Sequence, residues 1–160
     1  MGGDILQIQL SQKEQMLLED AKKQEDICIK KYQGYANQVQ DVELKNLLTE
    51  IASQEQHHYN MIDQMLQGQQ PDMSPSAVSQ PPSGGSTTQG FSGNVSDQML
   101  LTDLLSTEKY VSAFYDTAIF EAADPQVRQA IQHIQRDEQT HGEKIFNYMH
   151  SHGMYEVKYP

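Results

Sequence analysis

Two stretches of this sequence carry the same pattern: residues 48–62 read LTEIASQEQHHYNMI, and residues 131–145 read IQHIQRDEQTHGEKI. Apolar residues recur in both at steps of three and four, the spacing of one face of a helix. A Glu-x-x-His motif interrupts each apolar series at the same place. The motifs are Glu55 with His58 and Glu138 with His141. Each stretch therefore predicts a helix whose buried face contains a glutamate and a histidine.

The repeat extends well beyond these two stretches. An offset of 83 residues aligns the second half of the chain with the first without a gap. The aligned pairs include Glu25 with Glu108, Tyr32 with Tyr115, and Asp41 with Asp124. Matches at both polar and apolar positions indicate a duplicated helical hairpin.

Helix start and stop signals place the first hairpin at residues 11–67. Ser11, with a glutamate three residues later, is typical of a capping box and predicts a helix to about Gln40. Asp41 is a suitable cap for a second helix, which should continue to about Gln67, where Gly68 ends it.

Similar signals place the second hairpin at residues 96–151. Ser96 is a suitable N-cap, and its helix should run to about Ala123. Asp124 and Pro125 supply a cap and a first-turn proline for the last helix, which should end near Ser151.

Residues 68–95 are rich in Pro, Gly, Ser and Gln and have the composition of a flexible linker. A tail, 152–160, follows the second hairpin. Nearly thirty linker residues can reach roughly 100 Å when extended, whereas a helix of this size is roughly 40 Å long. We therefore predict one all-α domain over 1–160: an antiparallel four-helix bundle with a long crossover between its second and third helices.

Glutamates and histidines occupy the middle of the predicted buried seams, where Leu or Ile is expected. They are Glu25, Glu55, His58, Glu108, Glu138 and His141. A carboxylate in an apolar core costs several kcal/mol, and four at one level repel one another. Two bound cations would resolve both problems, and this ligand set is the arrangement of two-metal bundles. The alternative is a metal-free polar layer of Glu–His hydrogen bonds.

Other polar side chains lie near these seams. Tyr32 and Tyr115 follow the first glutamate of their hairpins by two helical turns. Each could be a hydrogen-bond donor to a ligand, a redox-active phenol or a packed core aromatic. We expect Cys28 to act as a small buried hydrophobic residue rather than as a redox-active thiol. The remaining candidates fit solvated helix faces better than ligand positions. They are Glu121, Glu143, His57, His133, His150 and His152.

The composition excludes several partners. The net charge of −11 disfavours nucleic acids and anionic membranes. One cysteine allows no disulfide framework and no cysteine-based metal cluster. The chain starts without a basic and apolar leader and contains no run of 18 apolar residues, so we expect an intracellular protein without membrane insertion.

The six ligand candidates and the two tyrosines resemble the rubrerythrin and bacterioferritin branch of the ferritin-like superfamily. That resemblance implies two iron or manganese ions, bridged by Glu55 and Glu138. Glu25 with His58 would complete one ion, and Glu108 with His141 the other. It also implies oxidation of ferrous iron or reduction of peroxide. The cysteines of a rubredoxin domain are absent.

Residues 99–155 resemble the Coat F family of spore coat proteins from endospore-forming bacteria. The likeness is carried by Asp103-Leu104-Leu105, Glu108-Lys109-Tyr110, Glu121-Ala122-Ala123-Asp124-Pro125, His141-Gly142-Glu143-Lys144-Ile145 and Gly153-Met154-Tyr155. It implies a spore coat location, with other coat proteins or a second copy of the chain as partners. Two alternatives remain: a structural coat protein with a vestigial site, and a redox-inert metal store or sensor.

Overall fold

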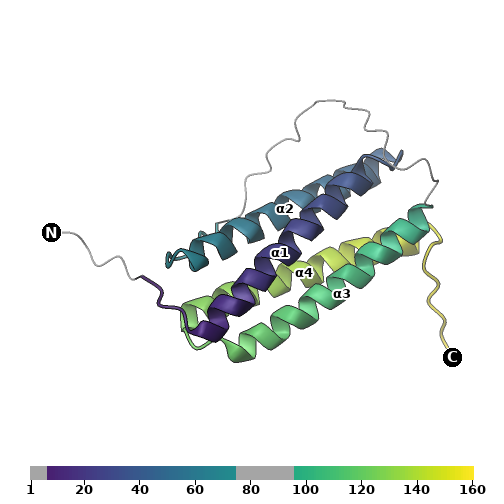
Figure 1. Cartoon of the computed structure of the whole chain (residues 1–160). Helices are drawn as coiled ribbons and strands as arrows, with labels where there is room; N and C mark the ends of the chain where they lie inside the picture. Colours follow the sequence, from purple (N-terminus) through teal and green to yellow (C-terminus); the bar gives the residue numbers. More distant parts are fainter. Residues whose placement is uncertain (1–6, 75–95) are drawn as a thin grey trace.

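The computed structural model describes residues 7–74 and 96–160, which form four α-helices (Figure 1). Their bounds are α1, Gln12–Ala36; α2, Val42–Leu66; α3, Asp97–Glu121; and α4, Pro125–Ser151. No strand occurs within these ranges. The prediction of an all-α four-helix bundle is confirmed. Residues 75–95, which make up most of the predicted linker, and residues 1–6 at the start of the chain lie outside the described residues.

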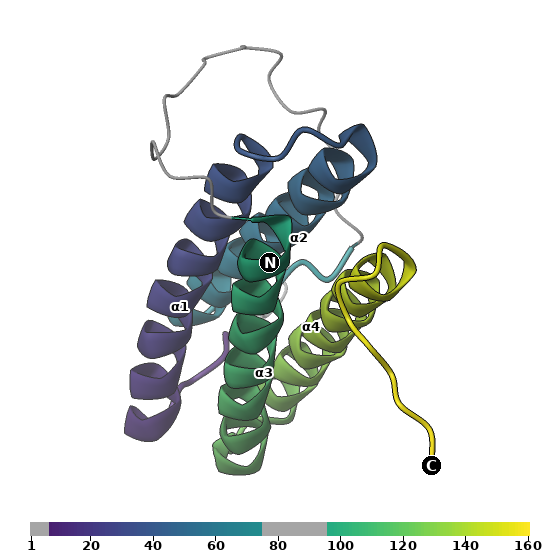
Figure 2. The same cartoon turned by 90° about the vertical axis from the view of Figure 1, so that its right-hand side faces the viewer.

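The helices pack as two antiparallel hairpins, α1 with α2 and α3 with α4 (Figures 1 and 2). Across the hairpins, α1 lies against α3 and α2 against α4. Lys13 at the start of α1 pairs with Glu121 at the end of α3, so these two helices run in opposite directions. Consequently α2 ends and α3 begins at opposite ends of the bundle, as the predicted crossover requires.

The four predicted N-caps are present. The side chains of Ser11, Asp41, Ser96 and Asp124 each accept a hydrogen bond from a backbone N–H in the first turn of their helix. Ser11 forms the complete capping box expected from the sequence. The helices therefore begin where local side-chain chemistry predicts.

The first helix is shorter than predicted: α1 ends at Ala36 rather than near Gln40. The backbone N–H groups of Gln38 and Val39 both donate to the carbonyl of Tyr35, which closes the last turn. Leaving the helix allows Val39 to bury its side chain in the core at this end of the bundle. Burial of one apolar residue thus overrides the helical tendency of the following polar residues.

Glu14 on α1 explains why α3 ends at Glu121 rather than near Ala123. Its Oε2 accepts hydrogen bonds from the backbone N–H groups of Ala123, at 3.1 Å, and Asp124, at 3.0 Å. Its Oε1 accepts one from the N–H of Ser11, at 2.8 Å. One buried carboxylate therefore joins the start of α1 to the turn between α3 and α4.

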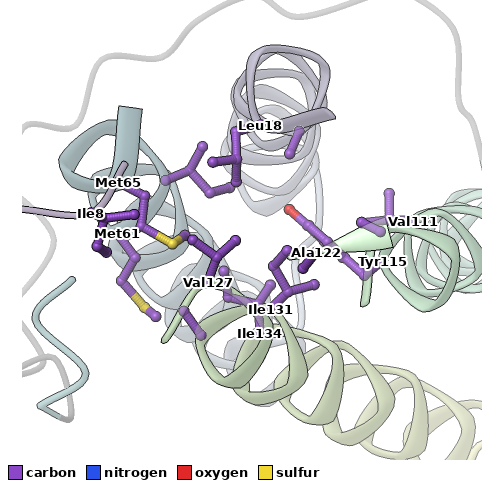
Figure 3. Packing of buried hydrophobic residues seen from close by; sticks show 14 of the residues in the cluster. Ile8, Leu18, Met61, Met65, Val111, Tyr115, Ala122, Val127, Ile131 and Ile134 are labelled. Atoms are coloured by element: carbon purple, nitrogen blue, oxygen red, sulfur yellow. The ribbon is translucent and has the colours of Figure 1, made fainter. Parts of the chain in front are cut away.

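The core consists of two apolar clusters. The cluster in Figure 3 includes Ile8, Leu18, Met65, Val127 and Ile134, and it packs around the ends of α1 and α2 that lie near residues 12 and 66. The second cluster fills the opposite end, with Leu44, Leu48 and Leu101 among its members. A buried polar layer separates the two clusters, and it contains the candidate ligands.

Candidate metal centre

All six candidate ligands lie in the middle of their helices with 0–3% of their surface exposed. α1 and α3 each contribute one glutamate, and α2 and α4 each contribute a glutamate and a histidine. Because Glu and His three residues apart share a helix face, both side chains of each motif are directed inward. The bundle therefore brings together every residue that the sequence singled out as a ligand.

Within the described residues the polar atoms form two groups, in each of which the ligand atoms lie within 4.8 Å of one another. One group contains Glu25, Glu55, His58 and Glu138; the other contains Glu55, Glu108, Glu138 and His141. Glu55 and Glu138 belong to both groups. This geometry suits two adjacent cations with two shared carboxylates.

Each histidine directs Nδ1 toward the carboxylates. His58 Nδ1 lies 3.0 Å from Glu138 Oε1 and 3.5 Å from Glu55 Oε2. His141 Nδ1 lies 2.9 Å from Glu55 Oε1 and 3.6 Å from Glu108 Oε1. In both rings, Nδ1 is thus the nitrogen available to a cation in the layer.

The opposite nitrogen of each ring binds a residue that the sequence analysis missed. His58 Nε2 lies 2.8 Å from Asp137 Oδ2, and His141 Nε2 lies 2.5 Å from Gln54 Oε1. Both acceptors stand one position before the glutamate of their own helix, so they come from the helix opposite the histidine they contact. Such hydrogen bonds fix the tautomer and orientation of a ligating imidazole.

The two tyrosines connect the hairpins through the glutamates. The Tyr32 hydroxyl donates to Glu108, and the Tyr115 hydroxyl donates to Glu25. Burial and the nearby carboxylates raise the pKa of both phenols well above its ordinary value, so both stay protonated donors. Figure 3 shows Tyr115 extending from α3 toward α1 at the edge of the apolar cluster.

The layer concentrates negative charge in a dry environment. Burial, with repulsion from neighbouring carboxylates, raises the pKa of Glu25 and Glu138 well above its ordinary value. Burial acts on Glu55 in the same direction, but the adjacent Glu25 carboxyl and the two histidines outweigh it and hold the pKa of Glu55 well below the usual range. Burial lowers the pKa of His141, but Glu108 and Glu55 raise it to about 10. Without a metal, the negative charge of the layer is therefore reduced by bound protons. A bound cation would neutralise the same charge.

Unpaired buried atoms show that the donor set fits metal ions. Five carboxylate oxygens and one ring nitrogen in this layer lack a partner in hydrogen-bond geometry, although oppositely charged neighbours such as His141 and Glu55 approach within 2.9 Å. They are Glu25 Oε2, Glu55 Oε1, Glu55 Oε2, Glu108 Oε2, Glu138 Oε2 and His141 Nδ1. Leaving such groups unpaired costs about 1–3 kcal/mol each. Carboxylate oxygen and imidazole nitrogen are suitable ligands for iron and manganese.

The other polar candidates lie outside the two groups. Cys28 is buried, and burial together with the nearby glutamates raises the pKa of its thiol; it remains a protonated, packed side chain. Glu121 and Glu143 are exposed, and His150 and His152 are exposed as well. His57 and His133 are half-buried.

Tyr35, three residues after Tyr32 on α1, does not reach the polar layer. It is half-buried, and its hydroxyl donates to Asp103 at 2.7 Å. The phenol therefore ends at the polar edge between α1 and α3 rather than in the core.

Comparison with known proteins assigns the two hairpins to related families. Residues 96–158 match the Coat F domain, and residues 7–80 match the rubrerythrin family. The chain is therefore a ferritin-like protein whose second hairpin is similar to Coat F domains and whose first hairpin is similar to rubrerythrins. No curated protein matches its sequence.

A solved structure supports the ferritin-like fold. It is a two-domain protein from Anabaena variabilis with DJ-1/ThiJ/PfpI-like and ferritin-like domains. The match covers 94% of the chain at 17% identity, with a TM-score of 0.70. The chain spans 40% of that protein's length. No helix in the described ranges has the length and hydropathy needed to span a lipid bilayer.

Proposed function

We propose that this ferritin-like protein binds two iron or manganese ions in the polar layer of its bundle. Glu55 and Glu138, which belong to both ligand groups, would be shared by the two ions. Glu25 with His58 completes one position, and Glu108 with His141 completes the other. The observation that carries the proposal is the pair of buried ligand groups sharing two glutamates, with five carboxylate oxygens left unpaired.

The proposed activity is oxidation of ferrous iron or reduction of hydrogen peroxide. A bound pair of ferrous ions would supply the two electrons that, together with two protons, reduce one hydrogen peroxide molecule to two molecules of water. The protein's own side chains prepare the site. Tyr32 and Tyr115 orient the glutamates that they contact. The apolar clusters on both sides shield the buried ligands from solvent.

We place this function in the spore coat, because the Coat F match covers the second hairpin. Oxidation of iron or removal of peroxide would protect the coat and its contents from oxidative damage. Partners in this setting are other coat proteins or further copies of the chain.

Metal analysis tests the binding proposal. Full-length protein is purified without chelator, stripped, and reconstituted with ferrous iron or Mn²⁺ under nitrogen. We expect two ions per chain. Glu55→Gln should lose more bound metal than Glu25→Gln, because Glu55 serves both positions. Wild-type protein that retains no transition metal after reconstitution would leave the hydrogen-bonded polar layer as the correct description.

Kinetics test the activity. Stopped-flow absorbance follows the oxidation of the ferrous protein by oxygen or hydrogen peroxide, beside a His58→Ala, His141→Ala double variant. We expect faster oxidation by the wild type than by the double variant or free ferrous iron. Equal rates for the two proteins would contradict the catalytic proposal without affecting the binding proposal.

A second candidate function, a structural part of the coat, is favoured by the outer surface. Ile27 on α1 and Tyr110 and Phe120 on α3 are 54%, 69% and 83% exposed. Ile27 and Tyr110 line one surface groove between α1 and α3, and contiguous exposed apolar patches mark contact surfaces. Deletion of the gene followed by complementation separates the two functions. Normal coat assembly with the Glu55→Gln, Glu138→Gln variant would assign the coat role to the surface rather than to the metal.

A further inference from the structure

The two halves of the candidate centre differ in the residue that contacts the outer nitrogen of each ligand histidine. Gln54 and Asp137 are equivalent in the internal repeat, each standing immediately before a ligand glutamate. Gln54 accepts from His141 Nε2, and Asp137 accepts from His58 Nε2. Each half contributes two glutamates and one histidine as candidate ligands. The two acceptors therefore introduce a chemical difference between the halves, and they contact the ligands directly.

An acidic and an amide acceptor affect an imidazole differently. A carboxylate hydrogen-bonded to the N–H of a ligating histidine raises the basicity of the ring and strengthens its bond to the metal. It also places one more negative charge near the cation. An amide oxygen fixes the orientation of the ring equally well but brings no charge. His58 should therefore be the stronger of the two imidazole donors.

The surroundings of the two acceptors do not cancel this difference. Asp137 is 32% exposed and also lies 3.6 Å from His133 Nε2, one turn away on α4. The repeat position of His133 is occupied by Glu50, whose carboxylate pairs with Lys144 at 3.2 Å. Asp137 lies nearer to His58, at 2.8 Å, than to His133. Glu50 is paired with Lys144, so it does not supply Gln54 with the charge that Gln54 lacks.

We propose that the two metal positions are not equivalent, and that the position of Glu25 and His58, supported by Asp137, binds its divalent cation more tightly and fills first. This inference rests on the proposed function, since it requires that both positions bind metal. It adds Asp137 and Gln54 as positioning residues that set the order of filling.

Titration of the stripped full-length protein with Co²⁺ tests the inference. Calorimetry gives the affinity of each step. NMR of ¹⁵N-histidine-labelled protein shows whether the signals of His58 or His141 shift first. We expect two steps separated by about 10- to 100-fold in affinity, the range typical of changes in partners of metal ligands. His58 should respond in the tighter step.

Two isosteric substitutions alter only the charge of the acceptor. Asp137→Asn should weaken the tighter step by about 10- to 100-fold and leave the other nearly unchanged. Gln54→Glu should strengthen the weaker step, which a merely structural role of Gln54 would not produce. The double variant should reverse the order, so that His141 responds first. Asp116→Asn, an exposed change on α3, controls for net charge.

The outcomes separate this inference from the proposed function. Two Co²⁺ ions bound with equal affinity in the wild type, or variants that change both steps alike, would overturn the inference while the metal site stands. Wild-type protein that binds no Co²⁺ would overturn both.

Discussion

The hydroxyl of Tyr32 on α1 donates its hydrogen bond to Glu108 on α3, in the other hairpin. The repeat reproduces this contact with the hairpins exchanged, because Tyr115 donates to Glu25. Each hairpin therefore orients a candidate ligand that belongs to its partner. The two contacts tie the halves of the bundle together at the level of the polar layer.

Replacing either tyrosine should destabilise the metal-free protein. Tyr32→Phe leaves a buried Glu108 oxygen without its donor, a loss of about 1–3 kcal/mol. Tyr115→Phe should cost a similar amount at Glu25. Urea denaturation measures both changes. Tyr35→Phe is the matched control: its hydroxyl binds half-buried Asp103, where water can replace it, so its effect should be smaller. Equal losses in all three variants would show that the buried contacts have no special weight.

Glu138→Gln should separate stability from metal binding. It removes a buried carboxyl that burial and neighbouring carboxylates disfavour in its charged form. We expect the metal-free variant to gain about 0.5–2 kcal/mol, as is common when a functional site is relaxed.

Added Mn²⁺ should reverse this ranking. At a free concentration 100 times the dissociation constant, binding stabilises the wild type by about 2.7 kcal/mol per site, and the variant should gain much less. Thermal unfolding with Mn²⁺ and with chelator measures both effects. A variant less stable than wild type without metal would mean that Glu138 contributes more as a hydrogen-bonding group than it costs as a buried charge.

The sequence predicts the parts of the structure that depend on periodicity and capping. The seams, the four caps and the meeting of the six candidate ligands follow from residue spacing alone. Gln54 and Asp137 were missed because they lie off the seams and act on the opposite helix. A signal was present, since each stands four residues before a histidine and next to a ligand glutamate. Such contacts depend on how two helices are rotated against each other, which single-helix periodicity does not specify.

Glu14 shows a second limit. Its position in a capping box predicts the bond to Ser11, but not that its other oxygen meets the turn after α3. That contact joins residues more than a hundred positions apart. It arises from the antiparallel packing of α1 on α3, which local sequence signals do not reveal.

Glu14 should make stability depend on pH in acid. Burial raises its pKa, but hydrogen bonds from Asp124, Ser11 and Ala123 outweigh this and lower it below the ordinary value of 4.5. A group with a lowered pKa in the folded state contributes its full stabilisation above its unfolded value and loses it as the pH falls through the folded value. The contribution should be constant above about pH 4.5 and decline below it.

Comparison with Glu14→Gln isolates this contribution. Glutamine has one acceptor oxygen in place of two, so one set of backbone donors loses its partner, at about 1–3 kcal/mol near neutral pH. Urea denaturation from pH 7 to pH 3 should show the gap between the two proteins shrinking below pH 4.5. Glu19→Gln, an exposed change on the same helix, should show little difference at any pH. A gap that widens in acid would contradict the assigned direction.

Gly34 in α1 and Gly68 just after α2 should respond in opposite directions to the same substitution. Gly68 follows α2 with φ +79°, and a Cβ built on it would lie 3.3 Å from the carbonyl oxygen of Ile8. Its own carbonyl accepts a hydrogen bond from the N–H of Ile8 at 2.8 Å, so the backbone there cannot easily move. Gly68→Ala should cost about 1–2 kcal/mol, because this backbone conformation is unfavourable for residues with a side chain.

Gly34 lies in the last turn of α1, where an added Cβ meets nothing within 4 Å. Gly34→Ala should therefore stabilise the protein by up to about 0.5–1 kcal/mol, because alanine loses less backbone freedom on entering a helix. Urea denaturation of the two variants under identical conditions compares them directly. A stabilising Gly68→Ala would mean that the chain after α2 is free to leave this turn and that the contact with Ile8 does not hold it.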